Sequence, residues 1–262
     1  MKDLRFWAKT ALYRLTPGGY GYYRHLKQFR DQNYLHSRDK HPVRDKHYGE
    51  GGWSEQSEEA SLRYRDYENY EEYLTHQKQK LDEMLKLNGG FTNQVIASYR
   101  QKFYSRFKVL PQYLSKSACI ICAGARQGTE VEVLQDLGFK NAYGIDLNPG
   151  PDNQWVRPGD FMKLENADNS VDMIYSNCLD HAFDLDAMFQ EHARVLKPDG
   201  FVLYDISTMG GGAFEAVNWH SGEAILQVIL RHFKILLKAD REDQWLWVLL
   251  RGKHSLQAKT DA

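Results

Sequence analysis

Cysteine is scarce in this chain, and neither one sign of charge nor any long apolar run dominates it. Its 262 residues contain three cysteines, too few and too clustered for the disulfide framework of a secreted protein, so a cytoplasmic protein is expected. Lys and Arg number 34 against 35 Asp and Glu, a balance that disfavours a nucleic-acid partner. No stretch approaches the roughly 20 apolar residues of a membrane-spanning helix. With 42% hydrophobic residues, the chain can still bury a sizeable core.

The first 19 residues predict a basic amphipathic helix. Apolar residues recur at helical spacing from Leu4 to Leu15, and Pro17 ends the pattern. Such a helix can dock on the core of its own protein or lie on an anionic membrane, and both interpretations stay open. Residues 1–50 carry 11 Lys and Arg against 5 acids, which fits either peripheral membrane contact or a solvated face.

Tyrosine divides the chain unevenly, because 13 of its 16 copies lie at or before Tyr113. This part predicts helices, one over about 58–87 and another with Thr92 as its N-cap. Farther on, short apolar runs alternate with helical patterns, as in βαβ units with a mostly parallel sheet. We therefore predict a helical, tyrosine-rich extension over 1–113, an α/β domain over 114–254 and a tail over 255–262.

Six apolar runs predict the strands of this domain. They are Cys119–Ala123, Ala142–Asp146, Val171–Ser176, Phe201–Ile206, Phe233–Leu237 and Trp245–Leu250. The last two runs are too close for a helix to lie between them, so they should pair as an antiparallel hairpin. Cys119 and Cys122 point to opposite faces of the first strand, which excludes a shared metal or a redox pair and predicts two buried apolar side chains.

A glycine-containing loop follows the first strand and leads into a helix. It runs from Gly124 to Gly128, and the next strand ends at Asp146, 22 residues after Gly124. This separation is close to the roughly 20 residues between a nucleotide-binding loop and the acid that binds ribose. A carboxylate suits that role because it accepts hydrogen bonds from both hydroxyls of a diol. The combination indicates a ligand that contains adenosine.

Five segments carry a resemblance to a known family. They are Ile120–Glu130, Tyr143–Asn148, Gly159–Phe161, Ser170–Asn177 and Glu191–Gly200, the last containing Arg-Val-Leu-Lys-Pro-Asp-Gly. Together they resemble the successive motifs of class I S-adenosylmethionine-dependent methyltransferases of type 11, over about residues 118–250. The resemblance implies a Rossmann-like, seven-stranded, mostly parallel sheet with an antiparallel terminal hairpin. It also implies S-adenosylmethionine as the cofactor.

The resemblance also assigns a cofactor site. The residues it implies are Gly124, Ala125, Arg126, Gly128, Asp146, Leu147, Asp160, Phe161 and Asn177. In the family pattern, Asp146 holds the ribose, Asp160 accepts from the adenine amine, and Asn177 faces the methyl group. Two positions depart from that pattern, since Cys122 replaces an acid and Arg126 replaces a glycine. Arg126 must swing outward or approach the carboxylate of the cofactor as a cation.

Methyl transfer to a hydroxyl requires a group that removes its proton. We predict His181, oriented by Asp180 or Asp184, as this base, with His220 as the second candidate. His192 lies on an apolar helical stripe and is expected to be a core residue. The acids around Asp180 form no convincing ligand set, so no metal is predicted.

The expected function is therefore O-methylation of a small-molecule acceptor, such as a saccharide or natural product. Two alternatives stay open: an NAD(P)-dependent oxidoreductase, and a non-catalytic S-adenosylmethionine-binding module on the same fold. Nothing in the sequence predicts the oligomeric state.

Overall fold

The computed structural model describes residues 53, 62–88, 93–150, 153–207, 214–219, 221–241 and 245–252. The predicted N-terminal amphipathic helix and His220 lie outside these ranges. Within them, no helix has both the length and the apolar character needed to cross a membrane.

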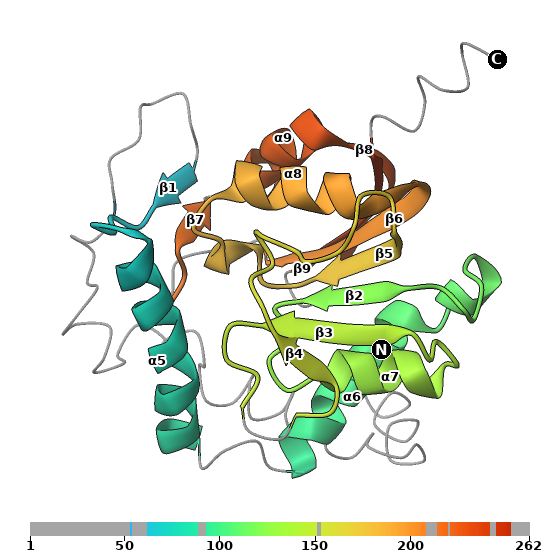
Figure 1. The fold of residues 1–262 in the computed structure, drawn as a ribbon, viewed down its shortest axis with the longest axis horizontal. Helices are drawn as coiled ribbons and strands as arrows, with labels where there is room; N and C mark the ends of the chain where they lie inside the picture. The colour runs from blue at the N-terminus through green and yellow to red at the C-terminus, as the bar shows by residue number, and fades with distance from the viewer. Residues whose placement is uncertain are drawn as a thin grey trace, which may run out of the picture.

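The central feature is a seven-stranded sheet with the order β4-β3-β2-β5-β6-β9-β8 (Figure 1). Its strands are β2 (Ile120–Ala123), β3 (Ala142–Asp146), β4 (Val156–Pro158), β5 (Val171–Ser176), β6 (Leu196–Ser207), β8 (Phe233–Arg241) and β9 (Trp245–Gly252). The pairings from β4 to β6 are parallel, whereas β9 runs antiparallel to both β6 and β8. The predicted Rossmann-like sheet and its terminal antiparallel hairpin are confirmed.

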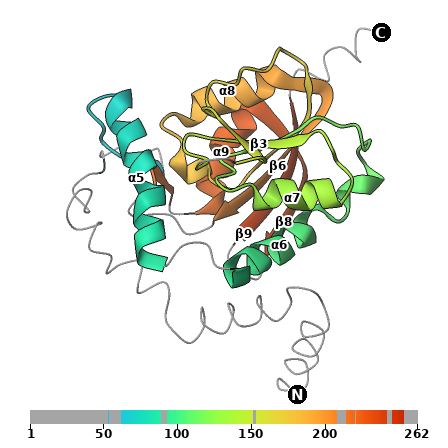
Figure 2. The same cartoon turned by 60° about the horizontal axis from the view of Figure 1, so that its bottom comes forward.

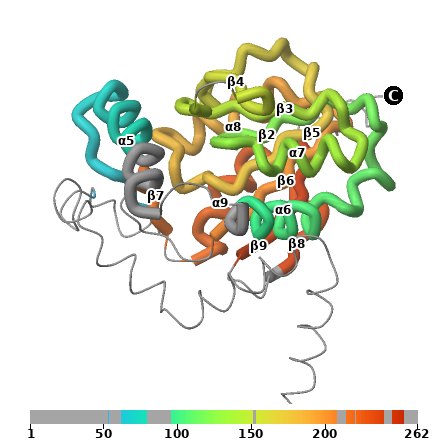
Figure 3. The backbone as a smooth tube through the Cα atoms, turned by 90° about the horizontal axis from the view of Figure 1, so that it is seen from below, coloured from blue at the N-terminus to red at the C-terminus, as the bar shows by residue number. Residues whose placement is uncertain are grey.

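Helices cover both faces of this sheet (Figures 1 and 3). The helices α8 (Leu185–Val195) and α9 (Gly222–His232) pack on one face, and α6 (Asn93–Phe107) and α7 (Thr129–Asp136) pack on the other. Each face buries its own apolar cluster, and the side chains of β2 divide between the two. Cys119 packs against the cluster under α8 and α9, whereas Cys122 lies in the cluster under α6 and α7. The expected opposition of these two cysteines is therefore confirmed.

The helix predicted over about 58–87 begins later than expected. Residues Leu62–Tyr64 form β1, which pairs antiparallel with β7 (Val217–Trp219), and the helix α5 spans Tyr70–Asn88. Leu62 and Trp219 are both buried where these strands meet. The tertiary pairing and the burial outweigh the local helical pattern, which explains why the prediction of this boundary was wrong.

Two further features bear on the predicted core and the predicted domain boundary. His192 is fully buried, and its Nδ1 lies 2.7 Å from the hydroxyl of Tyr204, so the expected core histidine is confirmed.

Phe103 and Phe107, from the predicted extension, pack edge-on against Tyr175 in β5. The extension thus contributes to the core of the sheet, and the division at residue 113 stays a prediction.

Candidate active site

A cleft of about 490 Å³ opens at the edge of the sheet where the parallel strands end. Helix α5 stands along this edge (Figures 1 and 2). The residues that line the cleft are Tyr73, Gln77, Gly124, Arg126, Asp146, Leu147, Asn148, Phe161, Cys178 and His181. We call Gly124, Arg126 and Asp146 the aspartate end, and Tyr73, Gln77 and His181 the histidine end.

Gly124 brings the loop after β2 close to its neighbours. Its φ is +75°, and a Cβ added there would lie 2.1 Å from the Sγ of Cys178. Gly128 has φ +82° and precedes α7, but its missing Cβ makes room for Trp155 at 2.5 Å, away from the lining of the cleft. Gly124 therefore shapes the cleft, whereas Gly128 allows the packing of the loop.

Arg126 occupies the position where the family pattern has a glycine. Its φ is +46°, in the left-handed region that favours glycine, so this backbone carries strain of about 1 kcal/mol. The compensation is visible in the contacts of its main chain. Its N–H donates to Oδ2 of Asp146 at 2.9 Å, and its carbonyl accepts from Nδ2 of Asn153 at 3.2 Å.

Asp146 ends β3 with its carboxylate held by the backbone. Oδ2 accepts from the N–H of Arg126 and Oδ1 accepts from the N–H of Asn148, both at 2.9 Å. A carboxylate has about four lone-pair sites, so two remain for a ligand. The side chain is thus oriented in advance to accept from a pair of hydroxyls.

Not every predicted cofactor residue lines the cleft. Phe161 does so with 5% of its surface exposed, whereas neighbouring Asp160 accepts from the hydroxyl of Tyr70 and, at 2.8 Å, from the N–H of Met162. Ala125 is buried and Asn177 is half-buried, and neither contributes to the lining. Cys178, which the sequence analysis did not select, lines it beside Gly124.

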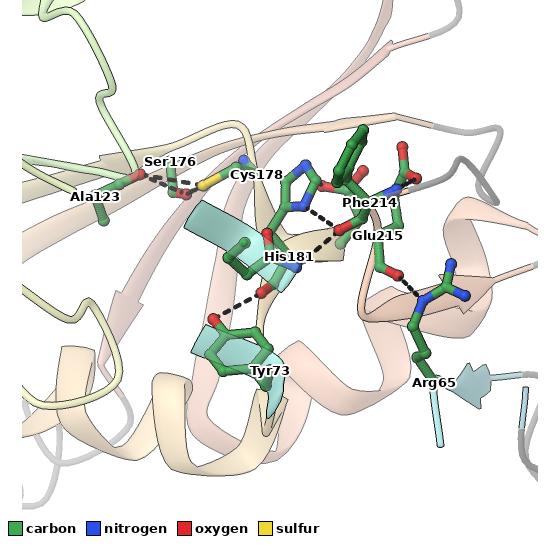
Figure 4. Close-up of polar contacts among 10 residues, drawn as sticks. Arg65, Tyr73, Ala123, Ser176, Cys178, His181, Phe214 and Glu215 are labelled. Atoms are coloured by element: carbon green, nitrogen blue, oxygen red, sulfur yellow. Dashed lines mark hydrogen bonds and ion pairs between the residues drawn. The ribbon is translucent and has the colours of Figure 1, made fainter. Parts of the chain in front are cut away.

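His181 is held at the other end of the cleft (Figure 4). Its Nδ1 lies 3.0 Å from the carbonyl oxygen of Phe214, which can only accept, so Nδ1 carries a proton and, in the neutral ring, Nε2 carries the lone pair. The main-chain oxygen of His181 accepts from the hydroxyl of Tyr73 at 3.0 Å. Oδ1 of Asp180 lies 3.9 Å from Nε2. This tautomer suits a proton acceptor or a metal ligand.

One side of helix α5 contacts three separate loops. Tyr70 donates to Asp160 after β4, Tyr73 donates to the main chain of His181 after β5, and Gln77 donates from Nε2 to the carbonyl of Phe214 at 2.8 Å. The spacing i, i+3, i+7 places the three side chains on one stripe. Nothing in the sequence indicated the distant loops that these side chains contact.

Comparisons with known proteins agree with this geometry. Residues 121–204 match the model of a family described as a methyltransferase domain. They form a class I, S-adenosylmethionine-dependent methyltransferase domain. No curated protein matches the chain.

Solved structures share the fold of this methyltransferase domain at low sequence identity. A 1,6-didemethyltoxoflavin-N1-methyltransferase from Burkholderia thailandensis is 14% identical with a TM-score of 0.56, covering 75% of this chain and 98% of its own. The PH0226 protein from Pyrococcus horikoshii is 17% identical with a TM-score of 0.54, covering 65% and 99%. A methyltransferase from Haloferax volcanii, solved with its Trm112 activator, is 15% identical with a TM-score of 0.53, covering 67% and 97%.

A buried acid lies beneath the aspartate end of this methyltransferase domain. Glu130, in the first turn of α7, is 6% exposed, and burial raises its pKa to about 8. Burial also raises the pKa of the Cys122 thiol well above its usual value, with the nearby Glu130 charge contributing. The acid that the family pattern has at position 122 is therefore absent from β2, but Glu130 lies close by. The sequence did not indicate that Glu130 is buried, because a glutamate in the first turn of a helix is ordinarily exposed.

The methyltransferase domain also gathers a group of side chains that could bind a metal. One ligand atom each from Asp180, His181 and Glu215 lies within 4.8 Å of the others. No metal was predicted from the sequence, because the acids near Asp180 form no convincing ligand set by themselves. Glu215 lies 34 residues after His181 and precedes β7, so only the fold brings it to this place.

Proposed function

We propose that this methyltransferase domain transfers a methyl group to an oxygen of a small-molecule or saccharide acceptor. The observation that carries the proposal is the carboxylate of Asp146, held by two backbone N–H groups at the edge of a cleft beside the Gly124 loop. Within a class I fold, this arrangement is suited to a ribose diol.

The residues of the cleft fit S-adenosylmethionine. Asp146 would hold the ribose hydroxyls, Leu147 and Phe161 would contact the adenine, and Arg126 would face the carboxylate of the methionine part. When bound, S-adenosylmethionine supplies a methyl group that bonds to the acceptor oxygen while the electron pair of the broken S–C bond stays on sulfur. Because Gly124 has no side chain, Cys178 can pack directly against this loop.

The histidine end would receive the acceptor. Nε2 of His181 presents a lone pair because its Nδ1–H donates to Phe214, so it can take the proton of an acceptor hydroxyl. Asp180, 3.9 Å away, would stabilise the imidazolium that forms. Tyr73 and Gln77 provide an aromatic face and an amide at the same end, which suit an acceptor bearing hydroxyl groups.

Two features favour methyl transfer over nicotinamide chemistry. Residues 121–204 match a methyltransferase model, and β9 lies between β6 and β8 as the class I resemblance implied. The Burkholderia neighbour was solved with a small molecule and S-adenosylhomocysteine bound, which supports a small-molecule acceptor. The Haloferax neighbour was solved with a protein activator. A partner protein is therefore a second kind of molecule to add if the purified chain alone is inactive.

Calorimetry with S-adenosylhomocysteine, beside NADH and NADPH, tests the proposal. We expect saturable binding of S-adenosylhomocysteine only, and a raised melting temperature in its presence. Transfer of a labelled methyl group to a panel of saccharides and phenols then tests the acceptor class. Binding of the nicotinamides alone would refute the proposal, and binding without transfer in a cell extract would favour the non-catalytic module.

A further inference from the structure

Three potential metal ligands converge where the acceptor would bind. We propose that Asp180, His181 and Glu215 form a site for a divalent transition-metal cation at the histidine end of the cleft. The site is inferred from the arrangement of these side chains. The part that the cation would play in catalysis rests on the proposed methyl transfer.

The spacing of the ligand atoms fits a site that closes on binding. One atom from each side chain lies within 4.8 Å of the other two, and Nε2 of His181 is 3.9 Å from Oδ1 of Asp180. Ligands at 2.0–2.2 Å from a tetrahedral ion stand about 3.4 Å apart. Small rotations of the two carboxylates would therefore bring the three atoms to coordinating distance.

The imidazole is already in the form that a metal ligand needs. Nδ1 of His181 donates to the carbonyl of Phe214 at 3.0 Å, so in the neutral ring Nε2 carries the lone pair that a metal would bind. Metal-binding histidines commonly use their second nitrogen in this way, because the bond fixes both the tautomer and the direction of the ring.

The backbone around the three ligands is fixed from several sides (Figure 4). The N–H of Ala216 donates to the carbonyl of Asp180 at 2.7 Å, and Nε of Arg65 donates to the carbonyl of Glu215 at 2.9 Å. The hydroxyl of Tyr73 donates to the carbonyl of His181. These contacts join η3 (Leu179–His181), the segment before β7 and the region around α5. The ligand set is therefore anchored in rigid structure.

Charge and burial favour a cation at this place. Glu215 is 5% exposed, and the side chains of Asp180 and His181 are 18% and 13% exposed. Two carboxylates and one imidazole thus gather in a partly buried position, where a divalent ion can interact with both carboxylates. One nitrogen and two oxygen ligands suit Mn²⁺, Fe²⁺ or Zn²⁺ better than Ca²⁺, which prefers oxygen alone.

A cation here would change how the acceptor loses its proton. Three protein ligands leave coordination positions open, as in catalytic metal sites. An acceptor hydroxyl bound there would have a lowered pKa and could release its proton to water, and Nε2 of His181 would serve as a ligand and not as the base. Methyl transfer measured after removal of metal with a chelator separates these two roles of His181. Transfer should stop if His181 is a metal ligand and continue if it is the base, because direct proton transfer to His181 needs no metal.

Binding of Mn²⁺ to the chelator-treated full chain tests the site. The signal of free Mn²⁺ in electron paramagnetic resonance should fall with a stoichiometry of one ion per chain. We expect Asp180→Asn, His181→Gln and Glu215→Gln each to weaken binding at least about tenfold. Asp136→Asn is the matched control, because Asp136 ends α7 outside the lining of the cleft, where its carboxylate accepts from Arg100. This control should bind Mn²⁺ within about twofold of the unmodified chain.

Each outcome decides one question. Absence of Mn²⁺ binding at millimolar concentration, or equal binding by the ligand variants, overturns the cation site. If Glu215→Gln fails to fold by circular dichroism, Asp180→Asn, at a less buried position, provides the result. S-adenosylhomocysteine is titrated into the same metal-free protein. Its binding without Mn²⁺ binding refutes the cation alone, whereas failure of both removes the proposed function as well.

Discussion

The two ends of the cleft are built in different ways. At the aspartate end, Asp146 contacts the backbone of Asn148 and Arg126, which are 2 and 20 positions away in the sequence. At the histidine end, His181 contacts partners 33 and 108 positions away, and the link from Arg65 to Glu215 spans 150. A βα unit specifies the first end almost alone, whereas the second requires α5, η3 and β7 to be assembled. The first is therefore accessible to motif analysis and the second is not.

Substitution of Asp146 should give the largest difference between the two ends. If Asp146 binds the ribose as proposed, Asp146→Ala removes two charge-assisted hydrogen bonds, and S-adenosylhomocysteine should bind about 100-fold more weakly or worse by calorimetry. Tyr73→Phe, at the histidine end of the same cleft, should leave this affinity within about twofold, because only an acceptor would contact it there. Equal losses in the two variants would show that the ends are not separate. Melting curves control for folding.

Glu130→Gln tests the buried acid beneath the aspartate end. The folded pKa of about 8 exceeds the ordinary 4.5, so the proton is held more tightly in the folded state. The contribution of Glu130 to stability is therefore full below pH 4.5 and is lost as pH rises through 8. Between pH 6 and pH 8 this loss amounts to about 2 kcal/mol of unfolding free energy.

Glutamine cannot ionise, so the variant should lack that loss. Urea unfolding at pH 6 and pH 8 measures the difference. A parallel pH dependence in the variant and the unmodified chain would mean that Glu130 does not titrate in this range. Glu165→Gln serves as the control, because position 165 is exposed and lies outside the cluster under α7.

Gly124→Ala tests the close approach of the loop to Cys178. The new Cβ would lie 2.1 Å from Sγ, so we expect a cost of about 1–3 kcal/mol in unfolding free energy beyond backbone strain. Gly150→Ala is the matched control, because its φ of +80° is similar and nothing lies within 4 Å. That control should lose only about 1 kcal/mol.

Cys178→Ala should remove the excess cost of Gly124→Ala. Without the sulfur, the nearest remaining atom of residue 178 is its Cβ at 3.5 Å, an ordinary contact. A double-mutant cycle by urea unfolding measures this coupling. An unchanged cost in the Cys178→Ala background would place the origin of the effect in the backbone alone.

Arg126→Gly should have the smallest effect. Glycine relieves the left-handed backbone but gains freedom in the unfolded chain, so stability should change by no more than about 0.5 kcal/mol. If the guanidinium faces the carboxylate of the cofactor, S-adenosylhomocysteine should bind about tenfold more weakly. Adenosine, which lacks that carboxylate, should bind equally to both proteins. Equal losses for both ligands would indicate a distorted loop.

Much of the fold could be predicted because its signals are local. Five of the six predicted strand runs agree with the observed strands to within one residue at the start, since apolar β-branched runs bounded by turns mark buried strands. β6 begins at Leu196, five residues early, because Leu196 pairs with Val171. The three-residue strands β1, β4 and β7 are too short to show a pattern of their own.

The predicted site divides along the same line. Gly124, Arg126, Asp146, Leu147 and Phe161 line the cleft, as does His181, although their roles remain predictions. Gly128 instead makes room for Trp155, and Asp160 is engaged by Tyr70 from α5. His220 lies outside the described residues. Cys178, Tyr73, Gln77 and Glu215 were missed because each acquires its place through a distant contact.

Local sequence patterns were sufficient to predict the parallel sheet, the terminal hairpin, the glycine-containing loop and Asp146 at the end of β3. These features depend on hydrophobic periodicity and on contacts within one βα unit, both of which are written locally in the chain. Tertiary structure alone decided that α5 lines the cleft and that Glu215 joins Asp180 and His181. It also buried Glu130 and raised its pKa. Such outcomes arise from packing between distant segments, and the free energy of burial depends on those neighbours and not on the residue itself.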